Sequence, residues 1–172
     1  MSRIGERVLP VLAGLLLLAW TLPVVAASTD AAPADVGSET GLPLPRFVSV
    51  KSTTANLRAG PGTDYPIRWI YRRADMPVRI VDEHGNWRAV RDPFGGEGWL
   101  HSSLLSGRRT AMVMTDLAPV RHGPSSAEPV ELYAERRVIA VLELCRDGWC
   151  RISLEGRVGW VAAADLFGSD PD

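Results

Sequence analysis

Residues 56–63 read Asn-Leu-Arg-Ala-Gly-Pro-Gly-Thr, and part of this motif returns as Arg-His-Gly-Pro at residues 121–124. Glycine allows backbone angles that other residues avoid, and proline restricts φ, so each Gly-Pro pair predicts a tight turn. A glycine-rich phosphate loop would instead lead into a helix carrying Lys followed by Ser or Thr, and neither is present. The motif therefore predicts a structural turn that is made twice.

The repeat continues beyond the motif. Pro66 corresponds to Pro129, Trp87 to Trp149, and the Gly-Trp pair at 98–99 to the Gly-Trp pair at 159–160. The spacing between copies shortens twice, around residues 84–86 and 93–96, and both places read as turns. Deletions are tolerated best in surface loops, so a spacing that shortens only at predicted turns supports the alignment. The chain is predicted to hold two tandem units, at residues 47–109 and 110–168.

Both units are predicted to be all-β. In the first unit, short apolar runs at residues 47–50, 67–71, 78–81, 87–90 and 98–100 alternate with turn residues, which is typical of strands. Five or six short strands are too few for two well-covered sheets. A small closed or partly open β-barrel is therefore expected in each unit.

The first 46 residues are predicted to lie outside the barrels. Residues 1–27 begin with two arginines, Arg3 and Arg7, continue with a leucine-rich run and end in Val-Ala-Ala. This is the pattern of an export signal cleaved near Ala27/Ser28. A retained membrane anchor is the alternative, because residues 8–27 are uncharged. In either case the rest of the chain is expected outside the cytoplasm, and after cleavage it would be periplasmic or secreted. Residues 28–46 lack an apolar period and predict a disordered linker, and residues 169–172 a short tail.

Cys145 and Cys150 are the only cysteines, and they flank Arg-Asp-Gly-Trp. Asp-Gly favours a two-residue hairpin turn, which pairs Arg146 with Trp149. The two cysteines are then directly opposite in a non-hydrogen-bonded pair, at a Cα separation of about 4.5 Å that suits a disulfide. A disulfide is predicted here, since export leads to an oxidising compartment.

The aromatic residues are the candidate ligand contacts. Strand alternation places Trp149 on the outer face, away from the apolar face of Cys150 and Ile152. Trp99 and Trp160 are expected to fill the barrels. The predicted ligand-binding residues are aromatic side chains of a groove, mostly in the first unit: Tyr65, Trp69, Tyr71, Trp87 and Trp149.

Composition and motifs argue against several functions. The formal net charge is −1, so nothing favours binding of nucleic acid. The chain shows no Ser-His-Asp or Cys-His catalytic pattern, no metal-ligand spacing and no phosphate loop. We therefore expect no enzymatic activity, no catalytic residues, no cofactor and no metal.

Residues 56–63, Trp87, the Gly-Trp-Leu at 98–100 and the Leu-Ser-Gly-Arg-Arg at 105–109 together resemble the bacterial SH3 (SH3b) domain. The resemblance is strongest to the tandem SH3-like proteins exported by Gram-negative bacteria, and it covers about residues 47–166. The second unit departs from the pattern, with Pro-Val at 119–120 and Ser-Ser at 125–126.

The resemblance implies two SH3-like barrels and, in many members, attachment to the cell wall or envelope. The hypothesis is a non-catalytic module that binds peptidoglycan peptide or glycan, or another envelope component, through aromatic grooves. A scaffold that binds an envelope protein is the alternative, and an accessory subunit of a cell-wall enzyme is a remoter one. A membrane partner is expected only if the N-terminal segment is retained.

Overall fold

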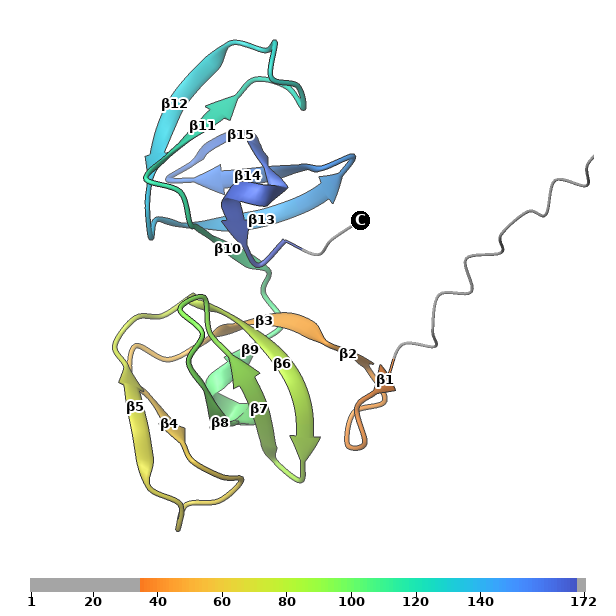
Figure 1. Ribbon diagram of the computed structural model, residues 1–172, viewed down its shortest axis with the longest axis vertical. Helices are drawn as coiled ribbons and strands as arrows, with labels where there is room; N and C mark the ends of the chain where they lie inside the picture. Colours follow the sequence, from red (N-terminus) through yellow and green to blue (C-terminus); the bar gives the residue numbers. More distant parts are fainter. Residues whose placement is uncertain (1–34, 170–172) are drawn as a thin grey trace, which may run out of the picture. The chain divides into compact units, whose positions relative to one another are not determined.

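The computed structural model describes residues 35–169, which form two antiparallel seven-stranded sheets in tandem (Figure 1). The strands of the first sheet are β3 (Arg46–Val50), β4 (Ala55–Arg58), β5 (Ile67–Tyr71), β6 (Pro77–His84), β7 (Trp87–Arg91), β8 (Glu97–His101) and β9 (Leu105–Ser106). Those of the second are β10 (Thr110–Val113), β11 (Leu117–Arg121), β12 (Val130–Glu135), β13 (Ile139–Arg146), β14 (Trp149–Leu154), β15 (Arg157–Ala162) and β16 (Leu166–Phe167). One 3-10 turn precedes the last strand of each sheet, at Ser102–Leu104 and Ala163–Asp165.

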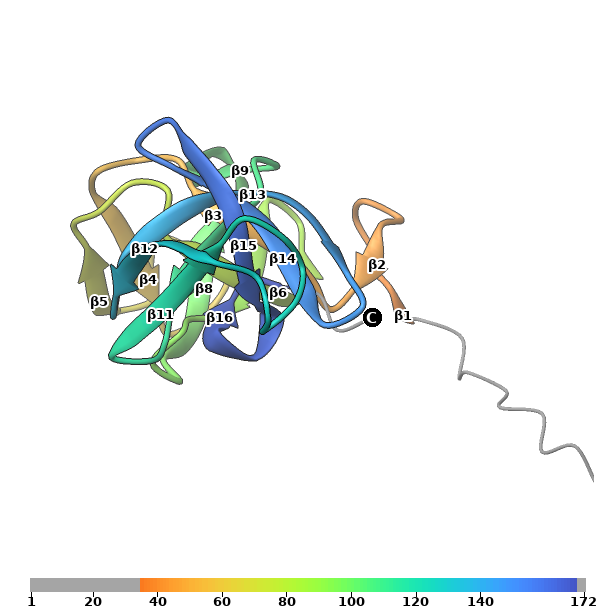
Figure 2. The ribbon, with the colours of Figure 1, turned by 90° about the horizontal axis from the view of Figure 1, so that it is seen from above.

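The two sheets have the same topology. The first runs β5-β4-β8-β7-β6-β3-β9 and the second β12-β11-β15-β14-β13-β10-β16, so each strand has a counterpart seven places later. Their strands curve strongly (Figure 1, Figure 2), and the end strands of each sheet do not pair with each other. Each unit is therefore a small, partly open β-barrel, which confirms the predicted all-β fold.

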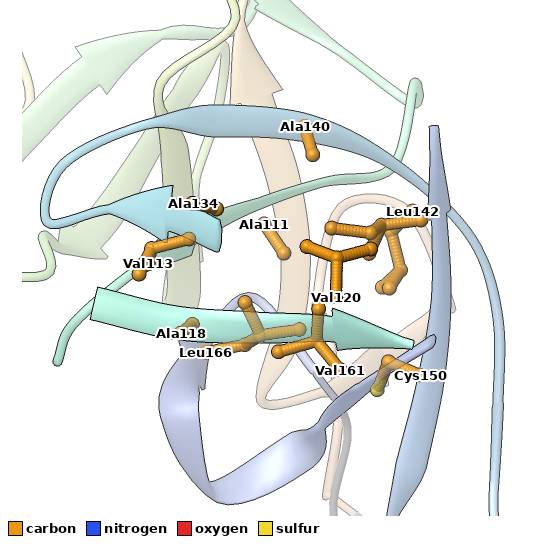
Figure 3. Close-up of a cluster of buried hydrophobic side chains, with 11 residues drawn as sticks. Ala111, Val113, Ala118, Val120, Ala134, Ala140, Leu142, Cys150, Val161 and Leu166 are labelled. Atoms are coloured by element: carbon orange, nitrogen blue, oxygen red, sulfur yellow. The ribbon is translucent and has the colours of Figure 1, made fainter. Parts of the chain in front are cut away.

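Each barrel has its own apolar core. Figure 3 shows the second core, where β10 contributes Ala111 and Val113, β13 contributes Leu142 and β15 contributes Val161. Strand alternation turns the intervening Met112 the other way, and it packs in the core cluster of the first barrel instead. The two barrels, together with the residues before them from 35 on, belong to one compact unit.

The repeated motif has the structural role that the sequence predicts. The guanidinium of Arg58 donates hydrogen bonds to the carbonyls of Thr63 and Tyr65, at 2.9 and 2.8 Å. In the second barrel Arg121 donates to the carbonyl of Glu128 at 2.7 Å. Each arginine thus stabilises, through hydrogen bonds to backbone carbonyls, the turn that contains the Gly-Pro pair.

The structure differs from the sequence prediction at residues 35–46, which were expected to belong to a disordered linker. Strands β1 (Asp35–Val36) and β2 (Pro43–Leu44) pair as a short hairpin, and β3 begins at Arg46. The expected export signal, residues 1–27, lies outside the described residues. Within residues 35–169 no helix has the length and apolar character needed to span a membrane.

A buried carboxylate explains why this hairpin is ordered. Glu83 of β6 accepts hydrogen bonds from the backbone N–H groups of Glu39 and Thr40, at 3.0 and 2.9 Å, and from the Thr40 hydroxyl at 2.8 Å. It also pairs with Arg46 at 2.6 Å. Gly37 lies so close to the carboxylate that any side chain there would collide with it. Glu83 is about forty residues from the hairpin in the sequence, so no local sequence pattern predicts that residues 35–46 are ordered.

Hydrogen bonding dominates the ionisation of Glu83. Burial by itself would raise the pKa of this carboxyl, but the hydrogen bonds from Arg46, Thr40 and Glu39 outweigh burial and lower the pKa to about 2. Glu83 is therefore ionised at any ordinary pH.

The predicted disulfide is present. Cys145 and Cys150 are directly opposite in the β13–β14 ladder, next to the Arg146–Trp149 pair, with a Cα separation of 4.1 Å. Asp147 and Gly148 both have positive φ, at 50° and 74°, as the expected two-residue turn requires.

The expectation that Trp99 and Trp160 fill the barrels is wrong. Both side chains are half-buried and outside the core clusters, whereas the next residues, Leu100 and Val161, are fully buried. The preceding Gly98 faces inward, where an added Cβ would lie 2.6 Å from the carbonyl oxygen of Arg58. Because neighbouring residues alternate across the sheet, an inward glycine turns the tryptophan outward.

Candidate functional site

An apolar groove of about 650 Å³ opens on the first barrel, between the edge strand β5 and the β7–β8 turn. Trp69 and Phe94 are its exposed aromatic side chains, 64% and 57% accessible to solvent. Such large exposed rings on ordered segments are frequent contacts in binding sites. The groove is lined by Leu57, Arg68, Trp69, Ile70, Tyr71, Arg72, Met76, Asp92, Phe94, Gly96, Glu97 and Arg137.

A buried hydrogen-bonded pair builds the floor of the groove. The Tyr71 hydroxyl donates to Asp92 at 3.0 Å, and the other carboxylate oxygen accepts from the N–H groups of Phe94 and Gly96, at 2.8 and 2.7 Å. Burial, followed by the charge and hydrogen bond of Asp92, raises the pKa of Tyr71 well above its ordinary range. Asp92 thus fixes the turn that presents Phe94, and both of its carboxylate oxygens accept hydrogen bonds.

Three arginines stand around the groove. Arg68 donates to the carbonyl of Glu97 at 3.4 Å, and the Arg137 guanidinium lies over the ring of Phe94, 5.2 Å from its centroid. Arg72 is exposed on the same lining. Arg137 comes from the turn between β12 and β13, so both barrels contribute to this groove. Cationic side chains beside aromatic rings can bind anionic groups attached to apolar ones.

A second hollow of about 290 Å³ lies elsewhere on the first barrel and shares no lining residue with the groove. Trp87 and His101 meet edge to face in it, with ring centroids 5.4 Å apart. The Nδ1 atom of His101 is 2.8 Å from the Ser103 hydroxyl.

The structure brings together only two of the predicted ligand contacts. Trp69 and Tyr71 line the groove, Tyr71 as part of its floor, whereas Trp87 lines the second hollow. Tyr65 lines neither, and its ring packs against Gly60. Trp149 is half-buried on β14 and lines neither of these two hollows.

Sequence reasoning missed Phe94, Asp92 and Arg137. Phe94 lies in a turn, where strand alternation carries no information, and Arg137 is more than forty residues further along the chain. An aromatic residue inside the Asp-Pro-Phe-Gly-Gly turn was the available signal for Phe94. Among the described residues, no three His, Cys, Asp or Glu side chains converge as a metal site would require.

The model of the bacterial SH3 domain matches this chain twice, at residues 51–107 and 115–168. The chain belongs to the bacterial SH3 family. The two matches fall on the two barrels, and the β1–β2 hairpin precedes the first of them. The tandem SH3 arrangement expected from the sequence is therefore confirmed.

One curated relative is a Bacillus subtilis (strain 168) protein, YrvJ, provisionally named an N-acetylmuramoyl-L-alanine amidase. It is 28% identical to this SH3 protein over 120 residues, which are 63% of this chain and 23% of the relative. This chain thus spans about a quarter of the length of the curated relative that it matches.

Two solved structures of NlpC/P60-type proteins are also similar. NlpC2 from Trichomonas vaginalis is 17% identical, with a TM-score of 0.34, over 73% of this chain and 48% of that one. A NlpC/P60 family protein from Bacillus cereus is 15% identical, with a TM-score of 0.32, over 70% of this chain and 55% of that one.

Proposed function

We propose that this SH3 protein is a non-catalytic module that binds peptidoglycan through the groove of Trp69 and Phe94. The observation that carries the proposal is this groove, where two exposed aromatic rings stand on a floor held rigid by Tyr71 and Asp92. Aromatic side chains offer large contact areas at a low cost in conformational entropy.

The relationship to a named amidase supports peptidoglycan as the ligand. That relative takes its name from an N-acetylmuramoyl-L-alanine substrate, and the match covers less than a quarter of its length. We propose that the matched part binds peptidoglycan. In this chain we propose the same attachment without catalysis.

The proposed function also requires that the protein is exported. A binder of peptidoglycan has to reach the envelope, and the pattern of residues 1–27 supports cleavage near Ala27/Ser28 and release into the periplasm or the medium. The mature protein would then meet its ligand in the compartment where the Cys145–Cys150 disulfide persists.

Co-sedimentation of the exported protein with purified peptidoglycan sacculi tests the proposal. Wild type should sediment with sacculi, and Trp69→Ala should lose most of this binding while remaining folded, because Trp69 is largely exposed. Tyr133→Ala is the matched control, since Tyr133 is an equally exposed aromatic residue on the edge strand β12 of the other barrel.

Two results would contradict the proposal. If wild type stays in the supernatant but captures an envelope protein through Trp69, the chain is a protein-binding scaffold. If Trp69→Ala and wild type sediment equally, the groove is not the binding site.

A further inference from the structure

The groove holds cationic groups that nothing in the described protein neutralises. Neither Arg72 nor Arg137 has a carboxylate partner among residues 35–169, although both line the groove. Elsewhere in this part of the chain some arginines are paired with acids, as in Arg46–Glu83, Arg91–Glu97 and Arg136–Asp116. Others, such as Arg73 and Arg121, donate to backbone carbonyls instead.

The acidic residues of the groove are already satisfied. Asp92 accepts from the Tyr71 hydroxyl and from two backbone N–H groups, and Glu97 pairs with Arg91 at 2.6 Å. Neither carboxylate forms an ion pair with the guanidinium of Arg72 or Arg137. The groove is therefore locally cationic, although the chain as a whole has a formal net charge of −1.

The backbone holds Arg137 in a conformation that L-residues rarely adopt, with φ at 69°. Two hydrogen bonds support it, one from the Arg137 N–H to the Val113 carbonyl at 2.8 Å and one from the Arg73 guanidinium to the Arg137 carbonyl at 2.9 Å. The guanidinium is thereby placed over Phe94. Asp75, in the equivalent turn of the first barrel, has φ at 61° and donates its N–H to the Val50 carbonyl at 2.7 Å, so this backbone geometry belongs to the fold. What distinguishes Arg137 is that its side chain lines the groove.

We infer that the groove takes the peptide part of peptidoglycan, a short peptide with free carboxylates, and that Arg72 and Arg137 bind those carboxylates. Trp69 and Phe94 pack against the aliphatic parts of the same peptide. This inference rests on the proposed function and names the part of the polymer that is bound. Guanidinium and carboxylate form paired, charge-assisted hydrogen bonds, so the geometry suits an acid better than a neutral sugar.

Calorimetric titration with three defined probes tests the inference. The probes are a disaccharide-peptide released from sacculi, the same compound with its carboxylates converted to amides, and glycan strands from which the peptides have been removed. The acidic probe should bind wild type, with an affinity that falls as salt is added. The amidated probe should bind about tenfold or more weakly, and the bare glycan should not bind.

Substitutions of the two arginines test whether they bind the carboxylates of the acidic probe. Arg72→Gln and Arg137→Gln should each weaken binding of the acidic probe about tenfold, and each should bind the amidated probe as wild type does. Arg72→Lys should retain part of the affinity. Arg136→Gln is the matched control, because this neighbour is paired with Asp116 and does not line the groove. Melting curves show whether each variant is folded. The comparison of the acidic and amidated probes uses the wild-type protein, so it tests the inference even if a variant does not fold.

The inference and the proposed function fail differently. If wild type binds the acidic and amidated probes equally, or if bare glycan binds as well as the acidic probe, the carboxylate inference is overturned while peptidoglycan binding stands. If wild type binds neither sacculi nor any of the probes, the proposed function is overturned and the inference with it.

Discussion

At the same register position in corresponding hairpins, the first barrel places Glu83 opposite Arg88 and the second places Cys145 opposite Cys150. Both pairs lie one step from the turn, and both turns are followed by a tryptophan. The second barrel closes its hairpin covalently. The first uses a carboxylate whose further hydrogen bonds hold the β1–β2 hairpin. The fold thus accepts either solution, and the noncovalent one also joins a segment outside the repeat to the barrel.

The groove shows a second difference between the barrels. In the β4–β5 ladder Leu57 pairs with Trp69 and Ala55 with Tyr71, and the corresponding β11–β12 pairs are Val120 with Leu132 and Ala118 with Ala134. By the same register Asp92 corresponds to Leu154. The second barrel therefore lacks counterparts of Trp69, Tyr71 and Asp92, which fits the proposal that the groove of the first barrel binds the ligand.

The largest expected effect comes from Glu83→Ala. Removing this buried carboxylate takes the acceptor from Arg46, Arg88 and two backbone N–H groups, in a partly buried place, and it frees the β1–β2 hairpin. Breaking a buried, hydrogen-bonded ion pair costs about 3 kcal/mol of unfolding free energy. Urea denaturation measures the loss. Asp116→Ala, which breaks the exposed pair with Arg136, is the control and should cost less than about 1 kcal/mol.

Replacing both cysteines by serine should cost less, about 2 kcal/mol, because the disulfide closes a short loop. Hydrogen exchange followed by mass spectrometry should show protection lost in β13 and β14 and largely kept in β6 and β7. Equal loss in both hairpins would mean that the barrels unfold as one cooperative unit.

Tyr71→Phe should have a smaller effect, about 1.5 kcal/mol, because one hydrogen bond to a buried carboxylate is removed while two backbone donors remain on Asp92. Thermal unfolding checks this value. Tyr133→Phe on the second barrel should leave the melting temperature unchanged, since the Tyr133 hydroxyl is exposed. If Tyr71→Phe also weakens binding of sacculi, the floor positions the groove as well as stabilising the barrel.

The smallest effect is expected from mild acid near pH 4, because most of the contribution of Glu83 is lost only at lower pH. The pKa of Glu83 is about 2 in the folded protein and about 4.5 ordinarily, so its contribution to stability is complete above pH 4.5 and declines as the pH falls toward 2. Urea denaturation at a series of pH values should therefore show a loss below pH 4.5. In Glu83→Gln this part of the pH dependence should disappear. An unchanged pH profile in that variant would show that other carboxyls cause the loss.

The sequence by itself determined the tandem repeat, the all-β class and the register of the disulfide hairpin. Each of these depends on local chemistry: Gly-Pro and Asp-Gly favour particular turns, and a two-residue turn decides which side chains are opposite. Arg58 and Arg121 reinforce the same turns, so the local signal and the tertiary contacts agree at both copies.

Only the tertiary structure decided the order of the β1–β2 hairpin and the make-up of the groove. Residues 35–46 have no apolar period, and their order depends on the carboxylate of Glu83, which is distant in sequence. Trp69, Phe94 and Arg137 come from an edge strand, a turn and the other barrel. Alternation along a strand reports one strand's faces, whereas a groove arises where separate segments meet, so its composition becomes known only when the chain is folded.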